Sequence, residues 1–158
     1  MNREIKFRAW DSVHNKMIYS DKHLGFRPFE DDNSFDDYDF NISKKGVYCL
    51  AYDEYDDDFG GGGVCNEIDL PIMMWTGLKD KNGVEIYEGD LIDIHQTVNG
   101  YNQFVIQYDN YKFSARYYNQ KTKHILGWYQ YDLDELFEIN ETEKEIEVIG
   151  NIYENEVD

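Results

Sequence analysis

The chain has 158 residues with 33 acidic and 15 basic side chains, so its formal net charge is −18. Nucleic-acid binders and proteins that dock on anionic lipid need an excess of Lys and Arg, and this balance argues against both. The length predicts one domain with a real core, since a domain has about 100–200 residues. Aromatic residues make up 16% of the chain, which favours strands over disorder.

The sequence also indicates a compartment. No stretch approaches the roughly 18 apolar residues of a membrane span, and the first residues lack the apolar run of a secretory signal. Cys49 and Cys65 belong to no CxxC pair, so we expect two reduced thiols, with a single disulfide as the less favoured alternative. We therefore expect a cytoplasmic protein with no membrane contact, metal or cofactor.

Residues 1–20 predict an antiparallel hairpin. Residues 4–10 alternate with period two, and residues 16–19 form a short apolar run after the turn formers of DSVHNK. The alternation places two sets of side chains on opposite faces, Ile5, Phe7 and Ala9 on one and Lys6, Arg8 and Trp10 on the other.

Residues 21–70 differ in kind and predict an acidic, variable lobe. The segment from Glu30 to Asp58 holds 11 acidic and two basic residues, a net of −9. Within it, residues 46–52 predict a strand. An acidic run follows and ends in Gly60–Gly63, a composition typical of a flexible loop. We expect the loops of this lobe to be the most mobile part of the chain.

Residues 71–158 predict a series of short strands. The first, at 71–77, is expected to end at Gly77, and Asn82-Gly83 predicts a type I′ turn in which both residues have positive φ. Further strands are expected in the ranges 91–95, 103–108, 111–118, 127–131 and 146–153. Asp109-Asn110 suits a two-residue hairpin turn, and residues 132–137 predict a single helical turn.

These strands predict a mainly β, or β-rich α+β, fold. Five short strands with one helical turn before the last match a small, partly open barrel of the SH3-like kind, with a five-stranded Greek-key barrel as the competitor. The whole chain is then a single domain, 1–158, in which the hairpin (1–20) and the acidic lobe (21–70) join a barrel-like subdomain (71–158).

Three segments together resemble the YopX-like family of bacteriophages and prophages. They are REIKFRAWD at residues 3–11, WTGLKDKNGVEIYEGDLI at 75–92 and IEVIGNIYEN at 146–155. The resemblance implies a phage-encoded, strand-rich protein of the bacterial cytoplasm, and it implies neither a reaction nor catalytic residues. Family members commonly have Phe where this chain has Trp75, an exchange that suggests packing.

Within these segments, ten residues are candidates for a structural motif. Glycines in turns permit positive φ, Asp80 and Asn82 suit Asx turns, and the large rings, including Tyr153, suit a common core. A ligand or partner surface is the alternative interpretation. The ten residues are Trp10, Trp75, Gly77, Asp80, Asn82, Gly83, Tyr87, Gly89, Asp90 and Gly150.

The candidate chemistry is sparse. In the acidic loop formed by Asp53, Glu54, Asp56, Asp57 and Asp58, Phe59 separates the acids from the glycine that an EF-hand needs, and no bidentate Glu follows. The run therefore predicts a solvated loop or a partner-binding surface, with a weak, nonspecific cation site as the less favoured alternative. Glu4-Ile5-Lys6 matches the E-x-K pattern of metal-dependent nucleases, a pattern that charged chains contain by chance. No histidine lies in a motif that would activate either cysteine.

The sequence therefore predicts a non-enzymatic module that binds a host or phage protein, one with a basic surface. DNA mimicry by the acidic lobe is a stronger form of this hypothesis, and solubility is the simpler explanation of the charge. Homo-oligomerisation is a variant. The alternative is an enzyme of nucleic-acid or nucleotide metabolism with an unrecognised carboxylate site.

Overall fold

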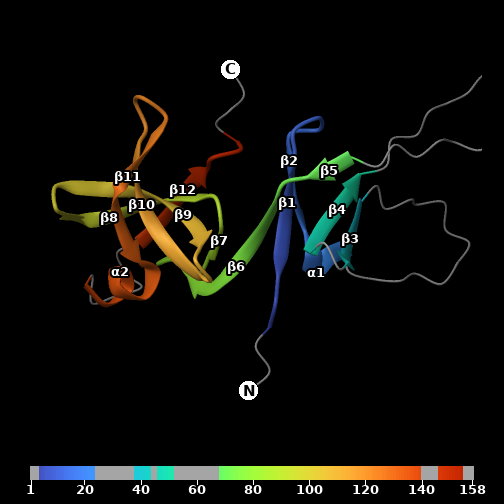
Figure 1. Ribbon diagram of the computed structural model, residues 1–158, viewed down its shortest axis with the longest axis horizontal. Coiled ribbons are helices and arrows are strands. Elements are labelled where there is room, and N and C mark those ends of the chain that lie inside the picture. Colours follow the sequence, from blue (N-terminus) through green and yellow to red (C-terminus); the bar gives the residue numbers. More distant parts are fainter. Residues whose placement is uncertain (1–3, 24–37, 44–45, 52–67, 140–145, 155–158) are drawn as a thin grey trace, which may run out of the picture. The chain divides into compact units, whose positions relative to one another are not determined.

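The computed structural model describes residues 4–23, 38–43, 46–51, 68–139 and 146–154. The chain divides into two compact units, of which unit 1 comprises Met1–Ile5 and Met73–Asp158, and unit 2 comprises Lys6–Ile72. The residues of the predicted hairpin and acidic lobe from Lys6 onward belong to unit 2. Figure 1 labels the elements of both units.

Unit 2 begins with the predicted hairpin. β1 (Phe7–Asp11) pairs antiparallel with β2 (Lys16–Tyr19), which leads into the short helix α1 (Ser20–His23). The Asp11 carboxylate fixes the turn, because its Oδ1 accepts hydrogen bonds from the backbone N–H groups of Val13 and His14 at 2.9 and 3.1 Å. An Asp at the start of a tight turn stabilises it in this way.

A three-stranded antiparallel sheet completes unit 2. Its order is β3 (Tyr38–Ser43), β4 (Gly46–Ala51) and β5 (Ile68–Leu70). The sequence predicted β4 and missed the other two, because β3 contains Asp and Asn within an acidic stretch and β5 has three residues. Hairpin and sheet meet in a core cluster formed by Ala9, Ile18, Cys49 and Leu70.

Both sets of side chains that the alternation places on opposite faces of β1 include buried residues. Arg8, Trp10 and Asp11 are buried together with Ala9, so both faces of the strand are covered. A strand covered on both faces no longer needs polar residues at every second position. A buried polar residue in this strand can instead serve a local hydrogen bond, as Asp11 does when it accepts the N–H groups of the turn.

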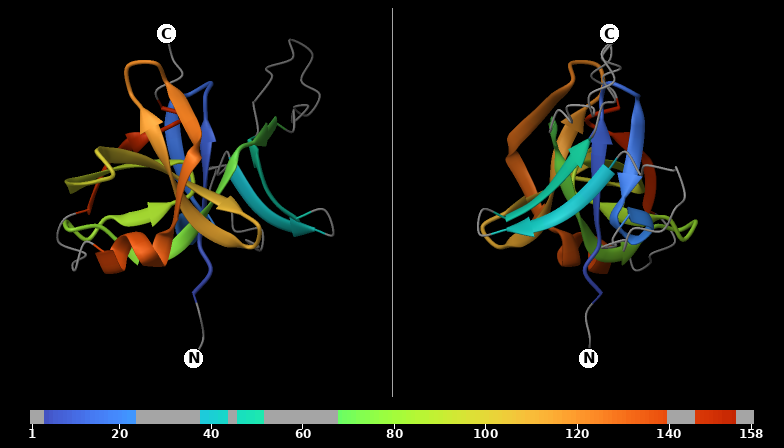
Figure 2. Two further views of the ribbon diagram at one scale, coloured as in Figure 1. Left: turned by 60° about the vertical axis from the view of Figure 1, so that its left-hand side comes forward. Right: turned by 90° about the vertical axis from the view of Figure 1, so that its right-hand side faces the viewer.

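Unit 1 contains a curled five-stranded sheet with the order β11-β10-β9-β8-β12, a partly open barrel as predicted. Four strands form a meander, and the fifth returns beside the first after the helix. Figures 1 and 2 show α2 near the ends of β10 and β11. The elements are β8 (Asp90–Val98), β9 (Tyr101–Asp109), β10 (Lys112–Asn119), β11 (His124–Asp132), α2 (Leu133–Ile139) and β12 (Ile146–Asn151).

The core of unit 1 lies inside this curl. The expected alternation in β8 is confirmed, because Ile92 and Ile94 are fully buried whereas Asp93 and His95 are not. A buried cluster here consists of Ile86, Ile92, Ile94, Phe104, Ile106, Ala115, Leu133, Leu136 and Ile146. The helix α2 contributes two leucines to it, so the single helical turn that the sequence predicted is part of the packing of the barrel.

A second hairpin precedes the barrel, and its details correct two expectations. β6 (Ile72–Lys79) continues through Gly77, whose φ of 92° allows the bulge that shifts its register with β7 (Glu85–Tyr87). The Asn82-Gly83 turn is not type I′, since only Gly83 has positive φ. The Gly83 N–H donates to the Asp80 carbonyl at 3.0 Å. The turn is therefore type I, followed by a glycine in the left-handed region.

The β9–β10 turn lies one residue later than predicted. It consists of Asn110 and Tyr111, with φ values of 49° and 64°, and Asp109 pairs with Lys112 across it. The shift arises because pairing continues to Asp109, which the sequence pattern assigned to the turn. In the described part of the chain, neither helix is long and apolar enough to cross a membrane.

Candidate functional site

Most of the predicted motif residues make contacts within unit 1. Gly89 donates its N–H to the Ile106 carbonyl at 2.8 Å and accepts a hydrogen bond from the Ile152 N–H at 2.9 Å. The Asp90 carboxylate accepts bonds from the Tyr87 N–H at 2.8 Å and from Asn151 Nδ2 at 3.3 Å. The second and third segments of the family resemblance therefore meet in space around Gly89.

Asp80 ties the β6–β7 turn to the last strand. Its Oδ1 accepts the N–H groups of Asn82 and Val84 at 2.8 and 2.9 Å, and its Oδ2 accepts the Val148 N–H at 3.1 Å. In the same strand, Gly150 has a φ of 153°, where the β12 register shifts against β8. One carboxylate thus organises a turn and a strand 68 residues away.

Four rings were expected to share a core, and they are buried to different extents. Trp10 is 6% and Tyr87 is 2% exposed, whereas Trp75 and Tyr153 are half-buried. Trp10 belongs to unit 2 and the other three to unit 1. Trp75 instead lines a surface groove, with its indole N–H donating to the Leu78 carbonyl at 3.2 Å.

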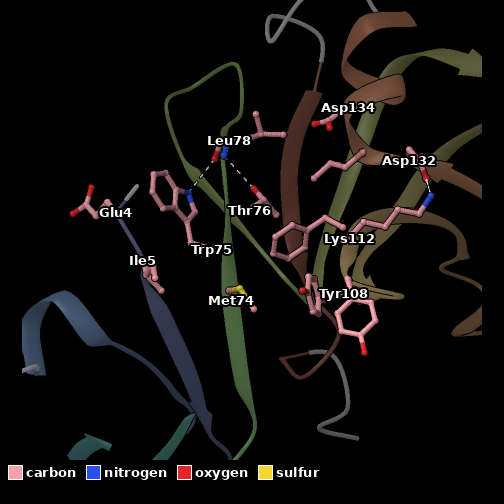
Figure 3. Close-up of a pocket in the computed structure, with 13 residues that line it drawn as sticks. Glu4, Ile5, Met74, Trp75, Thr76, Leu78, Tyr108, Lys112, Asp132 and Asp134 are labelled. Atoms are coloured by element: carbon pink, nitrogen blue, oxygen red, sulfur yellow. Dashed lines mark hydrogen bonds and ion pairs between the residues drawn. The ribbon is translucent and has the colours of Figure 1, made fainter. Parts of the chain in front are cut away.

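The groove is on unit 1 and has a volume of about 400 Å³. In the view of Figure 3, Trp75 and Glu4 lie on one side, and Tyr108 and Lys112 lie on the other. Its apolar and aromatic lining comes from the segment before β1, β6, the β9–β10 hairpin and the start of α2, and comprises Ile5, Met74, Trp75, Leu78, Tyr108, Tyr111, Phe113 and Leu133.

Several of these apolar groups are open to solvent. Tyr108 is 40% exposed and its ring is tilted against that of Phe113, with the centroids 5.0 Å apart. Tyr111 at the hairpin tip is 94% exposed, and Ile5 is 66% exposed. Exposed rings gathered at a concave surface are typical of a binding site, since scattered exposed apolar residues need no explanation but clustered ones do.

The charged lining of the groove is mostly acidic. It consists of Glu4, Lys112, Asp132 and Asp134, so its formal charge is 1 − 3 = −2. Lys112 Nζ lies 2.5 Å from Asp132 Oδ1, and this hydrogen bond raises the pKa of Lys112. Lys112 therefore stays a charged ammonium group. Such a group can bind an anion but cannot act as a general base.

A further carboxyl group lies next to the groove lining. Burial raises the pKa of Glu88, and backbone hydrogen bonds at Tyr108 and Met74 act in the opposite direction. Both backbone partners line the groove. Desolvation dominates here, so water has limited access to the Glu88 carboxylate.

The described residues do not assemble the chemistry that the sequence raised. They contain no group of three or more His, Cys, Asp and Glu side chains placed to hold a metal ion. Of the E-x-K pattern, Glu4 lines the groove and Lys6 does not. Cys49 is buried in the core of unit 2. Two predicted features lie outside the described residues, namely Cys65 and the acidic loop of Asp53, Glu54, Asp56, Asp57 and Asp58.

Sequence reasoning missed the groove itself. Its members come from four separate segments that only folding brings together. One signal was present, namely an Asn-Tyr pair at a hairpin turn, where Asn-Gly is the usual choice. A bulky residue at that position is unusual enough to suggest a role other than turn formation.

The motif segments agree with the comparison to known proteins. The YopX protein family model matches residues 6–157, nearly the whole chain, so the chain belongs to the YopX family. The chain is also similar to the crystal structure of protein EF1440 from Enterococcus faecalis, at 29% identity over 98% of this chain and 96% of that chain, with a TM-score of 0.46. No curated protein matches the sequence significantly.

Proposed function

We propose that this YopX-family protein is a non-enzymatic accessory protein, encoded by a phage or prophage, that binds a partner protein in the bacterial cytoplasm. The observation that supports the proposal most is the groove on unit 1, which is lined by the exposed Tyr108 and Tyr111 and by Trp75. Tyr and Trp supply much of the binding energy at protein interfaces, because they bury large areas and lose little rotamer entropy.

Electrostatics selects the partner. The groove carries a formal charge of −2 and the chain a charge of −18, so both attract a basic surface and repel phosphate groups. The acidic loop of residues 53–58 is predicted to add to this attraction. A partner with a basic surface would meet the protein at a rate that falls as salt rises.

An enzyme of nucleic-acid or nucleotide metabolism is the second candidate. One observation favours it, since the groove brings together two carboxylates, Asp132 and Asp134, and one lysine, Lys112. Against it, Lys112 is engaged by Asp132, and the pair is close to half exposed, as surface ion pairs commonly are. Hydrolysis of nucleotides or nucleic acids by the pure protein, abolished in Asp134→Asn, would establish this candidate instead.

Affinity capture from host lysate tests the proposal with four proteins. They are the natural chain, Tyr108→Ser in the groove, a variant with the acidic residues of 30–58 neutralised, and Val84→Ser as a control. Val84 is 48% exposed and does not line the groove. We expect the natural chain and the control to retain one basic protein in stoichiometric amount, and Tyr108→Ser to lose most of it.

Two results contradict the proposal. One is capture of no specific protein by the natural chain. The other is equal capture by the groove variant and the control, which would place the partner surface elsewhere. Light scattering on the pure protein shows whether it forms a homo-oligomer when no partner is present.

A further inference from the structure

Two hairpins of the five-stranded sheet use the same two-residue turn but different residues. The β8–β9 turn is Asn99-Gly100, with φ values of 53° and 85°. The β9–β10 turn is Asn110-Tyr111, with φ values of 49° and 64°. Both are turns with positive φ at both positions, for which Asn-Gly is the strongest natural signal.

Turn formation does not explain Tyr111. A side chain with a Cβ is strained at positive φ, and a bulky one is a genuine outlier there. Burial does not offset this strain, because Tyr111 is 94% exposed. Glycine, as in the neighbouring turn, would form the same hairpin without the steric cost. Strain of this kind persists where a residue serves another purpose.

The hairpin holds the Tyr111 ring at the groove. Tyr111 lines the groove with its neighbours Tyr108 and Lys112. The strands below the tip pair without interruption from Asp109–Lys112 to Phe104–Tyr117, and the side chains of Arg116 and Asp109 form an ion pair across them. The backbone that carries the ring is therefore braced, so binding does not have to order the hairpin tip.

We propose that Tyr111 is the anchor with which the groove holds an extended, Lys- and Arg-rich segment of a partner protein. The inference rests on the proposed function and specifies its partner. The three acidic groove residues attract the cationic ends, and the apolar lining suits the methylene stems of Lys and Arg. The exposed ring of Tyr111 offers a face for a guanidinium group.

Other occupants fit the charge less well. A second copy of the chain would bring −18 against −18. The Glu30–Asp58 stretch of the chain itself has a net charge of −9, so the acidic groove would repel it. Nucleic acid would place phosphates beside Glu4, Asp132 and Asp134. A basic peptide segment is the occupant that complements this charge.

The probe for the test is a library of random twelve-residue peptides displayed on phage. It is selected against the natural full-length chain, and the enriched peptides are then synthesised with a fluorescent label. Fluorescence anisotropy gives their affinities for the natural chain, Tyr111→Gly, Asp134→Asn, Lys112→Met and the control Val84→Ser. Thermal unfolding of every variant is measured in parallel.

We expect enrichment of peptides rich in Lys and Arg, with opposite responses of the variants. Tyr111→Gly should weaken binding by about tenfold, as loss of an interface anchor does, without lowering the melting temperature. Asp134→Asn should weaken binding about threefold, and Lys112→Met should strengthen it, since the formal charge of the groove then changes from −2 to −3. The control should bind as the natural chain does.

Three results overturn the inference. They are enrichment of no peptide, enrichment of acidic or uncharged peptides, and a Tyr111→Gly affinity within twofold of the natural one. The proposed function is tested separately, because partner capture that depends on Tyr108 would stand after any of these results. If Tyr111→Gly lowers the melting temperature, Tyr111 is structural and the inference fails.

Discussion

At the scale of single residues, two glycines of unit 1 share a backbone conformation and differ in their surroundings. Gly83 has a φ of +82°, and no atom lies within 4 Å of the point that a Cβ would occupy. Gly89 has a φ of +81°, and a Cβ there would lie 3.1 Å from Asn151 Nδ2 and 3.3 Å from Tyr153 Cε2. Both were predicted as turn glycines. Only the tertiary structure shows that Gly89 is also closely packed against other side chains.

Alanine at the two positions separates backbone strain from crowding. Gly83→Ala should lower the free energy of unfolding by about 1 kcal/mol, the cost of a Cβ at positive φ. Gly89→Ala should cost about 2–4 kcal/mol, because crowding against Asn151 and Tyr153 adds to the same strain. Urea unfolding of both variants measures the difference, and equal losses would show that the neighbours of Gly89 yield freely.

At the scale of elements, the β6–β7 hairpin is joined to β12 by one side chain. The Asp80 carboxylate accepts two N–H groups of its own turn and the N–H of Val148 in β12. Asp80 is 5% exposed, so these three donors would have little access to water if the carboxylate were removed. The sequence predicted the Asx turn. It did not predict the hydrogen bond from the Val148 N–H, which lies 68 residues away.

Removal of the Asp80 carboxylate should therefore loosen two elements at once. We expect Asp80→Ala to lower the free energy of unfolding by about 2–4 kcal/mol, since each buried donor left unsatisfied costs about 1–3 kcal/mol. Asp80→Asn, which keeps one acceptor oxygen, should lose less. Hydrogen exchange followed by NMR should show faster exchange at Val148 in the alanine variant. Unchanged protection there would mean that β12 does not depend on this bond.

At the scale of the whole molecule, the charge is distributed unevenly. The stretch from Glu30 to Asp58 holds −9 of the total of −18. The core cluster of unit 1 is aliphatic and aromatic, and ion pairs such as Lys81–Glu147 and Lys112–Asp132 lie at its surface. Fifteen basic residues leave most of the 33 carboxylates without an opposite charge, so self-repulsion should oppose compaction.

This excess charge predicts stabilisation by salt. Raising NaCl from about 20 to about 300 mM shortens the Debye length from roughly 20 to 6 Å, which screens repulsion between surface carboxylates. We expect the melting temperature to rise by a few degrees at pH 7. The rise should shrink near pH 4.5, where many carboxylates are protonated. A melting temperature that falls with salt would show that attractive ion pairs outweigh the repulsion.

The sequence by itself determined the strand content, the partly open barrel with its late helical turn and the family. These follow from local patterns, namely period-two alternation, turn residues and contiguous motifs. It did not determine β3 and β5, the burial of both faces of β1 or the position of the β9–β10 turn. The first two depend on neighbours that are distant in sequence, and the turn position depends on how far the pairing of β9 with β10 continues.

Only the tertiary structure decided the candidate site. The groove takes Glu4 from the first segment, Trp75 from β6, Tyr111 from a hairpin tip and Asp134 from α2. Strand pairing and the curl of the sheet bring these positions together, so no local sequence pattern links them. The one local trace of the site is a tyrosine where the backbone favours glycine, and the folded chain shows that this ring lies exposed at the groove.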